Sequence, residues 1–161
     1  MMSDVILNDL QIISFGLYNE EKNKQEIYGI TIDRVREIRL LETITIIPNS
    51  PSFVRGVMNL RGNIIPILDL KQKLGFSCPH KISPKVRILV AEINGKLVGL
   101  LVDGVEQIMK IPFSDIESNL SGGLESVSHI MGIAKNAEKL IVLLDVEKLM
   151  STSLASNQLE I

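Results

Sequence analysis

An internal repeat is the feature that most constrains the fold of this chain. The segment GITIDRVREI at 29–38 aligns with GLLVDGVEQI at 99–108, with Gly, Asp, Val, Glu and Ile at matching positions. In the same order along the chain, the segment 56–69 aligns without a gap with the equally long segment 132–145. Because these matches keep their order, the sequence predicts two copies of one small structural unit.

Each copy contains short strands that are separated by turn residues. The pair Asn94-Gly95 is the strongest hairpin signal, because a type I′ turn needs positive φ at both central positions. A second two-residue turn is expected at Gly62-Asn63. Strands are expected on either side of these turns and in the remaining apolar segments, at 11–17, 26–32, 56–61, 64–70, 87–93, 96–102, 132–136 and 139–146.

The composition favours strands over helices. Of the 161 residues, 45% are hydrophobic and only 4% are aromatic, so the core must consist mainly of Ile, Leu and Val. Two copies of a unit that is too small to bury its own faces well should pack around a shared aliphatic core. We therefore expect an all-β fold of two five-stranded β-barrels, with short helices after Asp69 and Asp145.

The repeat predicts a single domain made of two closely packed halves. The first half is expected at about 10–75 and the second at about 85–150, and their terminal segments can be exchanged. Residues 1–9 and 151–161 lack strong periodicity and are expected to be frayed tails.

Charge and cysteine content exclude several classes of protein. A net charge of −2 supplies no basic field for nucleic acid, and there are too few aromatic side chains for a single-strand groove. Cys78 is the only cysteine, so the sequence contains neither a disulfide framework nor a thiolate metal cluster. The N-terminus does not resemble a signal peptide, and no segment is long and apolar enough for a membrane span. We expect a soluble cytoplasmic protein that does not insert directly into a membrane.

The sequence offers little catalytic chemistry. His80 and His129 are far apart and lack nearby ligands, so we expect no metal and no cofactor. Asp69 and Asp145 occupy equivalent positions in the repeat, and a small barrel hydrolase that uses both carboxylates is a conceivable alternative. The better interpretation is that each aspartate caps a short helix. We therefore expect no catalytic residues and a protein that is not an enzyme.

The segment 51–70, PSFVRGVMNLRGNIIPILDL, resembles the hallmark of the CheW family of chemotaxis adaptors, and the similarity extends over about 10–150. The residues that match the family pattern are Pro51, Phe53, Gly56, Asn59, Leu60, Arg61, Gly62, Pro66, Asp69 and Leu70. The resemblance implies two SH3-like subdomains and a non-catalytic scaffold. Such a scaffold links the regulatory domain of the histidine kinase CheA to the cytoplasmic tip of methyl-accepting chemotaxis receptors. An adaptor of a non-flagellar signalling array is an alternative that the sequence leaves open.

The resemblance also implies binding residues. A receptor-facing groove between the subdomains is expected to include Val35, Glu37, Gly56 and Arg61. For the kinase-binding face, only the approximate region 86–112 can be nominated. The equivalent of Arg61 in the second copy is an alanine, so the hairpin itself does not require arginine there. Arg61 is therefore expected either to contact the receptor or to form a bond between the two halves. Binding to its partners is expected to recruit the protein to membrane receptor arrays.

Overall fold

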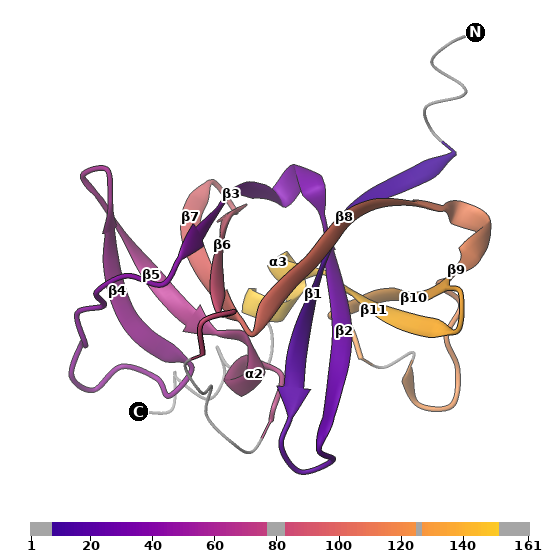
Figure 1. Ribbon diagram of the computed structural model, residues 1–161, viewed down its shortest axis with the longest axis horizontal. Helices are drawn as coiled ribbons and strands as arrows, with labels where there is room; N and C mark the ends of the chain where they lie inside the picture. Colours follow the sequence, from indigo (N-terminus) through magenta and orange to yellow (C-terminus); the bar gives the residue numbers. More distant parts are fainter. Residues whose placement is uncertain (1–7, 77–82, 125–126, 152–161) are drawn as a thin grey trace, which may run out of the picture. The chain divides into compact units, whose positions relative to one another are not determined.

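The computed structural model describes residues 8–76, 83–124 and 127–151 (Figure 1). Strands dominate these residues, and the helical segments are each a few residues long. The first part of the chain forms β1 (Asp9–Asn19), β2 (Lys24–Thr31), the 3-10 turn η1 (Ile32–Arg34), β3 (Val35–Leu40), β4 (Val54–Leu60), β5 (Asn63–Asp69) and α2 (Leu70–Lys73). The second part forms β6 (Arg87–Ile93), β7 (Lys96–Val102), β8 (Gly104–Pro112), the 3-10 turn η2 (Phe113–Asp115), β9 (Ile116–Glu117), β10 (Ile130–Asn136), β11 (Lys139–Leu144) and α3 (Val146–Ser151).

The strands form two sheets, and each sheet combines strands from both copies of the repeat. One sheet has the order β8-β1-β2-β11-β10-β9, and the other has the order β3-β6-β7-β5-β4. The initial hairpin of each copy therefore pairs with the final hairpin of the other copy, through the parallel pairs β2–β11 and β7–β5. The two contacts are equivalent, because Gly29 lies opposite Leu143 and Gly99 lies opposite Ile67.

The chain divides into two compact units that interleave along the sequence. Unit 1 comprises residues 1–15, 27–32 and 106–161, and unit 2 comprises residues 16–26 and 33–105. Terminal segments are thus exchanged relative to the consecutive halves 10–75 and 85–150. The physical reason is the strand pairing described above, which joins the start of each copy to the end of the other.

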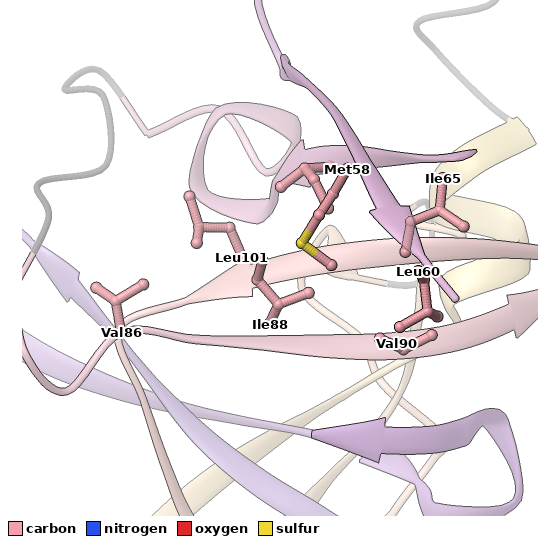
Figure 2. Packing of buried hydrophobic residues seen from close by; sticks show 8 residues of the cluster. Met58, Leu60, Ile65, Val86, Ile88, Val90 and Leu101 are labelled. Atoms are coloured by element: carbon pink, nitrogen blue, oxygen red, sulfur yellow. The ribbon is translucent and has the colours of Figure 1, made fainter. Parts of the chain in front are cut away.

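Each unit has an aliphatic cluster of its own. Figure 2 shows the cluster of unit 2, in which side chains from β4, β5, β6 and β7 and the adjoining Val86 point toward one another. Its buried members are Met58, Leu60, Ile65, Ile67, Val86, Ile88, Val90 and Leu101. The cluster of unit 1 is formed by Ile12, Ile111, Ala134, Ile141 and Leu143. The alternation of these residues along their strands directs one face of each strand inward, while a core shared by both halves stays a prediction.

One expected turn is displaced by a residue. Leu60 pairs with Asn63, so the turn between β4 and β5 consists of Arg61 and Gly62 rather than of Gly62 and Asn63. Both turn residues have positive φ, +50° for Arg61 and +90° for Gly62, as a type I′ turn requires. Arginine occupies a position that usually favours Gly or Asn, and this is why the sequence pattern pointed to the next residue pair.

The all-β fold class predicted from the sequence is confirmed, and so is the turn at Asn94-Gly95, which joins β6 to β7. One sheet has six strands rather than five, because the two-residue strand β9 pairs with β10. Among the described residues, no helix is long and apolar enough to cross a membrane.

Candidate partner-binding site

The four residues nominated for receptor binding all lie in unit 2. Val35 and Glu37 are on β3, which pairs with β6 and contains a bulge between these two residues. Gly56 is on β4, and Arg61 is in the turn that follows this strand. The bulge places Glu37 opposite Val90 and leaves Arg36, the extra residue, to pair through its side chain with Glu92.

The β4–β5 turn presents Arg61 at the end of a hairpin. The side-chain oxygen of Asn59 accepts a hydrogen bond from the Gly62 amide at 2.9 Å, which fixes the turn. The Arg61 side chain is 67% exposed, and it reaches Glu37 on β3. Its Nη2 donates to Oε2 of Glu37, and its Nη1 lies 3.4 Å from Oε1 of the same carboxylate. The structure therefore brings together two of the four predicted site residues through a two-point ion pair inside unit 2.

A second arginine, which the sequence analysis did not nominate, holds the same carboxylate. Nη1 of Arg39 donates to Oε1 of Glu37 at 3.3 Å, and its Nη2 donates to Oε2 of Glu42 at 2.8 Å. Glu37 and Arg39 are partly buried and follow one another at a spacing of two on β3. Because residues at this spacing share one face of a regular strand, the alternation of Glu37 and Arg39 was the sequence signal that could have identified this charged cluster.

The charges shift one another's protonation equilibria. The hydrogen bonds from Arg61, opposed by partial burial and reinforced by Arg39, lower the pKa of the Glu37 carboxyl. Glu37 in turn raises the pKa of Arg61, while Glu42 and then Glu37 raise the pKa of Arg39. Glu37 and the two arginines thus favour one another's charged forms.

Gly56 has a steric role in this unit. Its φ is +146°, a conformation that L side chains rarely adopt, and it lies at a bulge between Val54 and the rest of β4. A Cβ atom at this position would overlap the backbone carbonyl oxygen of Thr45 and the side chain of Ile44. Thr45 and Val57 exchange two backbone hydrogen bonds of 2.9 and 2.8 Å, so the close approach belongs to a paired segment. Gly56 therefore permits the chain after β3 to pack against β4.

Val35 is the first residue of β3, directly after η1, and is half-buried opposite Ala91. The bulge separates Val35 from Glu37, because their partners Ala91 and Val90 are successive residues of β6 and direct their side chains to opposite faces.

The two aspartates are helix caps, as the sequence analysis favoured. Oδ1 of the buried Asp69 accepts from the amides of Lys71 and Gln72 at 3.1 and 3.3 Å, and its Oδ2 lies 3.3 Å from Nη1 of Arg55. Oδ1 of Asp145 accepts from the amide of Lys148 at 3.1 Å. Both carboxylates are thus bonded to backbone amides at the starts of short helices, which is the capping role expected of them.

The other residues considered for catalysis or metal binding are the two histidines and Cys78. Burial lowers the pKa of His129, which is half-buried before β10. Cys78 and His80 lie outside the described residues. Within those residues, no group of three or more His, Cys, Asp or Glu side chains is placed to hold a metal ion. The nominated kinase-binding region 86–112 contains the whole of β6, β7 and β8. Among its described residues, the most exposed large apolar side chain is that of Ile108, at 57% exposure.

Comparisons with known proteins identify a family. The model of the CheW-like domain matches residues 11–154. A chemotaxis protein CheW of Klebsiella aerogenes is 33% identical over 143 residues, which cover 88% of this chain and 82% of the relative. A probable chemotaxis protein CheW of Rhizobium etli is 34% identical over 145 residues, which cover 89% of this chain and 88% of the relative.

A solved structure gives the same result at the level of the fold. The crystal structure of the scaffolding protein TtCheW from Thermoanaerobacter tengcongensis superposes with a TM-score of 0.76 at 33% identity, covering 90% of this chain and 94% of the other. The family model spans both compact units, and the relatives are covered over most of their length. The chain therefore belongs to the CheW-like domain family.

Proposed function

We propose that this protein is a non-catalytic adaptor of chemotaxis signal transduction, which couples the histidine kinase CheA to methyl-accepting chemotaxis receptors. The observation that carries the proposal is the match of the CheW-like domain model to residues 11–154. It is supported by relatives named chemotaxis protein CheW and by a similar solved protein that is described as a scaffolding protein. The helix-capping roles of Asp69 and Asp145 agree with a protein that binds partners without changing them chemically.

The receptor contact is assigned to Val35, Glu37, Gly56 and Arg61. Arginine has five N–H donors, and the pair with Glu37 engages the two terminal nitrogens of Arg61 from one side only. The high exposure of this guanidinium leaves it accessible to a carboxylate or carbonyl of a receptor helix. Because an exposed ion pair is screened by water, exchanging Glu37 for a receptor group requires little free energy. The arrangement suits an adaptor that must bind reversibly.

The receptor tip would bind as a helical hairpin, in the manner of a helix in a groove. In that mode apolar contacts supply affinity and the charged rim selects the partner. The cluster of Arg39, Glu42, Glu37 and Arg61 would form this rim. The kinase, through its regulatory domain, would bind at the approximate region 86–112. Recruitment by these partners would place a cytoplasmic protein at membrane receptor arrays.

A pull-down with two baits tests the proposal. The regulatory domain of CheA and a receptor-tip fragment are immobilised separately and incubated with the full chain. We expect both to retain it, and the variant Arg61→Glu should lose receptor binding while it keeps kinase binding. Arg36→Glu is the matched control, because Arg36 is an exposed arginine of the same unit that pairs with Glu92 instead. Failure of both baits to bind at tens of micromolar, about 6 to 7 kcal/mol of binding free energy, would rule out the proposed coupling.

A further inference from the structure

The parallel contact between β5 and β7 is shorter than either strand. Its register begins with Ile67 opposite Gly99 and continues to the end of β5, although β5 begins at Asn63 and β7 at Lys96. The two hairpins that contain these strands diverge toward their turns in Figure 1. A groove of about 440 Å³ lies where they diverge, lined by residues 63–66 and 96–98.

Pro66 explains why the ladder stops. The pair Leu60 and Asn63 closes one hairpin, and the pair Ile93 and Lys96 closes the other. Since backbone groups alternate in direction along a strand, those of residues 64 and 66 on β5 and of residues 97 and 99 on β7 point toward the facing strand. If the register continued beyond Ile67 and Gly99, the amide of residue 66 would donate to the carbonyl of Leu97. Proline has no amide hydrogen, so this rung cannot form.

The second copy of the repeat provides an internal comparison. The position equivalent to Pro66 is Val142, which has an amide hydrogen, and the parallel contact of β11 with β2 includes the pair Val142 and Tyr28. The equivalent pair in unit 2 is Pro66 and Val98, and the register of β5 with β7 begins one residue later. A single proline therefore accounts for one missing rung on the unit 2 side, while the parallel contact is short in both units.

The lining of the groove has three chemical components. Ile64 is 72% exposed, and together with Pro66 and Val98 it provides an apolar wall, while Ile65 points into the core. The backbone groups of Ile64 and Leu97 face the opening and offer donors and acceptors of the kind that pair with a strand. Lys96 places one positive charge at the rim.

We propose that this groove docks an extended segment of a partner protein by strand addition. The segment pairs its backbone with Ile64 and Leu97, places an apolar side chain beside Ile64 and Val98, and directs a carboxylate toward Lys96. An extended segment is favoured over a helix because a helix satisfies its own backbone groups and has none left for a strand edge. The single cation at the rim selects an acidic residue beside the apolar one. This site goes beyond the proposed function in the chemistry of its partner, and its residues 96–98 lie within the region 86–112 that is assigned there to the kinase.

The experiment uses the isotopically labelled full chain and short capped peptides as probes. Acetyl-EVIVT-amide is the acidic extended probe, acetyl-KVIVT-amide is its basic counterpart, and an alanine-rich helical peptide with one glutamate is the conformational control. We expect the acidic probe to shift the backbone amide resonances of Ile64 and Leu97 and to bind several-fold more tightly than the basic probe. We expect the helical peptide to leave these amides unchanged.

Three variants make the test specific. Ile64→Glu should weaken binding of the acidic probe by about tenfold or more, a change of about 1.4 kcal/mol. Leu140→Glu is the matched control, because Leu140 is the equivalent position in unit 1 and is 60% exposed. Pro66→Val supplies the missing amide hydrogen, and it should extend the β5–β7 ladder and abolish binding without lowering the melting temperature. If Pro66→Val does not fold, the pair of glutamate variants still decides the question.

Four results would overturn the proposal. They are the absence of binding by the acidic probe up to about 1 mM, equal binding by the Ile64→Glu and Leu140→Glu variants, and a preference for the helical peptide. The fourth is self-association of the free chain that Ile64→Glu abolishes, since a second copy would then be the occupant of the groove. None of these results bears on the pull-down with kinase and receptor.

Discussion

Arg61 and Glu37 are 24 positions apart in sequence and form a two-point ion pair in which the arginine is the more exposed partner, at 67% against 27%. Glu37 is held from the other side by Arg39, which is itself held by Glu42. The carboxylate therefore has a fixed partner on its own strand and an outer partner on the β4–β5 turn. This asymmetry makes Arg61 the side chain of the cluster that is best placed to exchange its partner.

A charge exchange separates a structural role of this pair from a role in binding. The double variant Glu37→Arg with Arg61→Glu restores opposite charges between positions 37 and 61, while each single variant places like charges together. The double variant also places an arginine beside Arg39, so its melting temperature should recover only in part. If the pair only supports the fold, receptor binding should recover along with the melting temperature. We expect receptor affinity to stay about tenfold or more below that of the native protein.

Calorimetry and titration with a receptor-tip fragment measure the two quantities on the same samples. Full recovery of receptor binding by the double variant would contradict a direct contact of Arg61 with the receptor.

The Glu37 carboxyl should respond unequally to the loss of its two arginines. The hydrogen bond from Arg61 is the largest cause of its lowered pKa, ahead of the bond from Arg39. We therefore expect Arg61→Ala to raise the pKa of Glu37 toward its ordinary value by more than Arg39→Ala does. Carboxyl carbon chemical shifts of Glu37, followed through an acid titration of each variant, measure this order. A larger rise in the Arg39→Ala variant would reverse our assignment of the dominant partner.

The pH dependence of the pair has a defined sign. Because the folded-state pKa of Glu37 lies below the usual value of 4.5, its contribution to folding is fully present above that value. The contribution is lost as the pH falls through the lower folded-state pKa. The melting temperatures of the native protein and of Glu37→Gln should therefore converge in acid below pH 4.5 and differ above it.

Gly56→Ala should destabilise unit 2 through its packing rather than through an interaction with any partner. The added methyl group meets the carbonyl of Thr45, and alanine must also adopt the unfavourable φ of +146°. Overpacking and backbone strain together predict a loss of about 2 to 4 kcal/mol in the free energy of unfolding. Gly62→Ala is the control, since its φ is +90° but a Cβ there would meet no atom within 4 Å.

Chemical denaturation measures both glycine variants. A loss in Gly62→Ala as large as that in Gly56→Ala would show that φ alone, and not the contact with Thr45, determines the cost.

The two helix-capping aspartates should differ in their contribution to stability although they are equivalent in the repeat. Asp69 is fully buried and is engaged by two amides and by Arg55, whereas Asp145 is half-buried and accepts from the amide of Lys148. Asp69→Ala should cost about 2 to 4 kcal/mol, because it removes a cap and a charge-assisted hydrogen bond in a buried site. Asp145→Ala should cost about 1 kcal/mol, the usual value for a cap. Equal losses in urea denaturation would contradict this ranking.

The strands and their turns follow largely from local sequence patterns. Asn94-Gly95 specified its hairpin because few other residues adopt positive φ at two successive positions without strain. The β4–β5 turn was misplaced by one residue because Arg61 adopts a φ of +50° that its side chain does not favour. Its equivalent, Ala137, has a φ of +58°, so both copies place an atypical residue in this turn. Backbone pairing on either side of the turn imposes the conformation in both cases.

The charged cluster was only half visible in the sequence. Glu37 and Arg61 were nominated separately, through a family resemblance, and no local rule joins residues so far apart. Arg39 was missed even though it lies two positions from Glu37 on the same strand face. Arg39 belongs to the cluster because its guanidinium contacts the same Glu37 carboxylate that Arg61 of the β4–β5 turn contacts. Contacts between side chains of different strands depend on tertiary packing.

The sequence by itself determined the all-β class, the repeat, the order of the hairpins and the caps at Asp69 and Asp145, because each depends on residues close together in the chain. Only the tertiary structure decided that the strands of the two copies exchange, that Arg61 meets Glu37, and that the β5–β7 ladder ends at Pro66. The physical reason is that hydrogen bonding between distant strands selects one register from many that the local pattern allows. A proline in a strand removes a rung of a sheet only where a facing carbonyl, here that of Leu97, would have accepted the missing amide hydrogen.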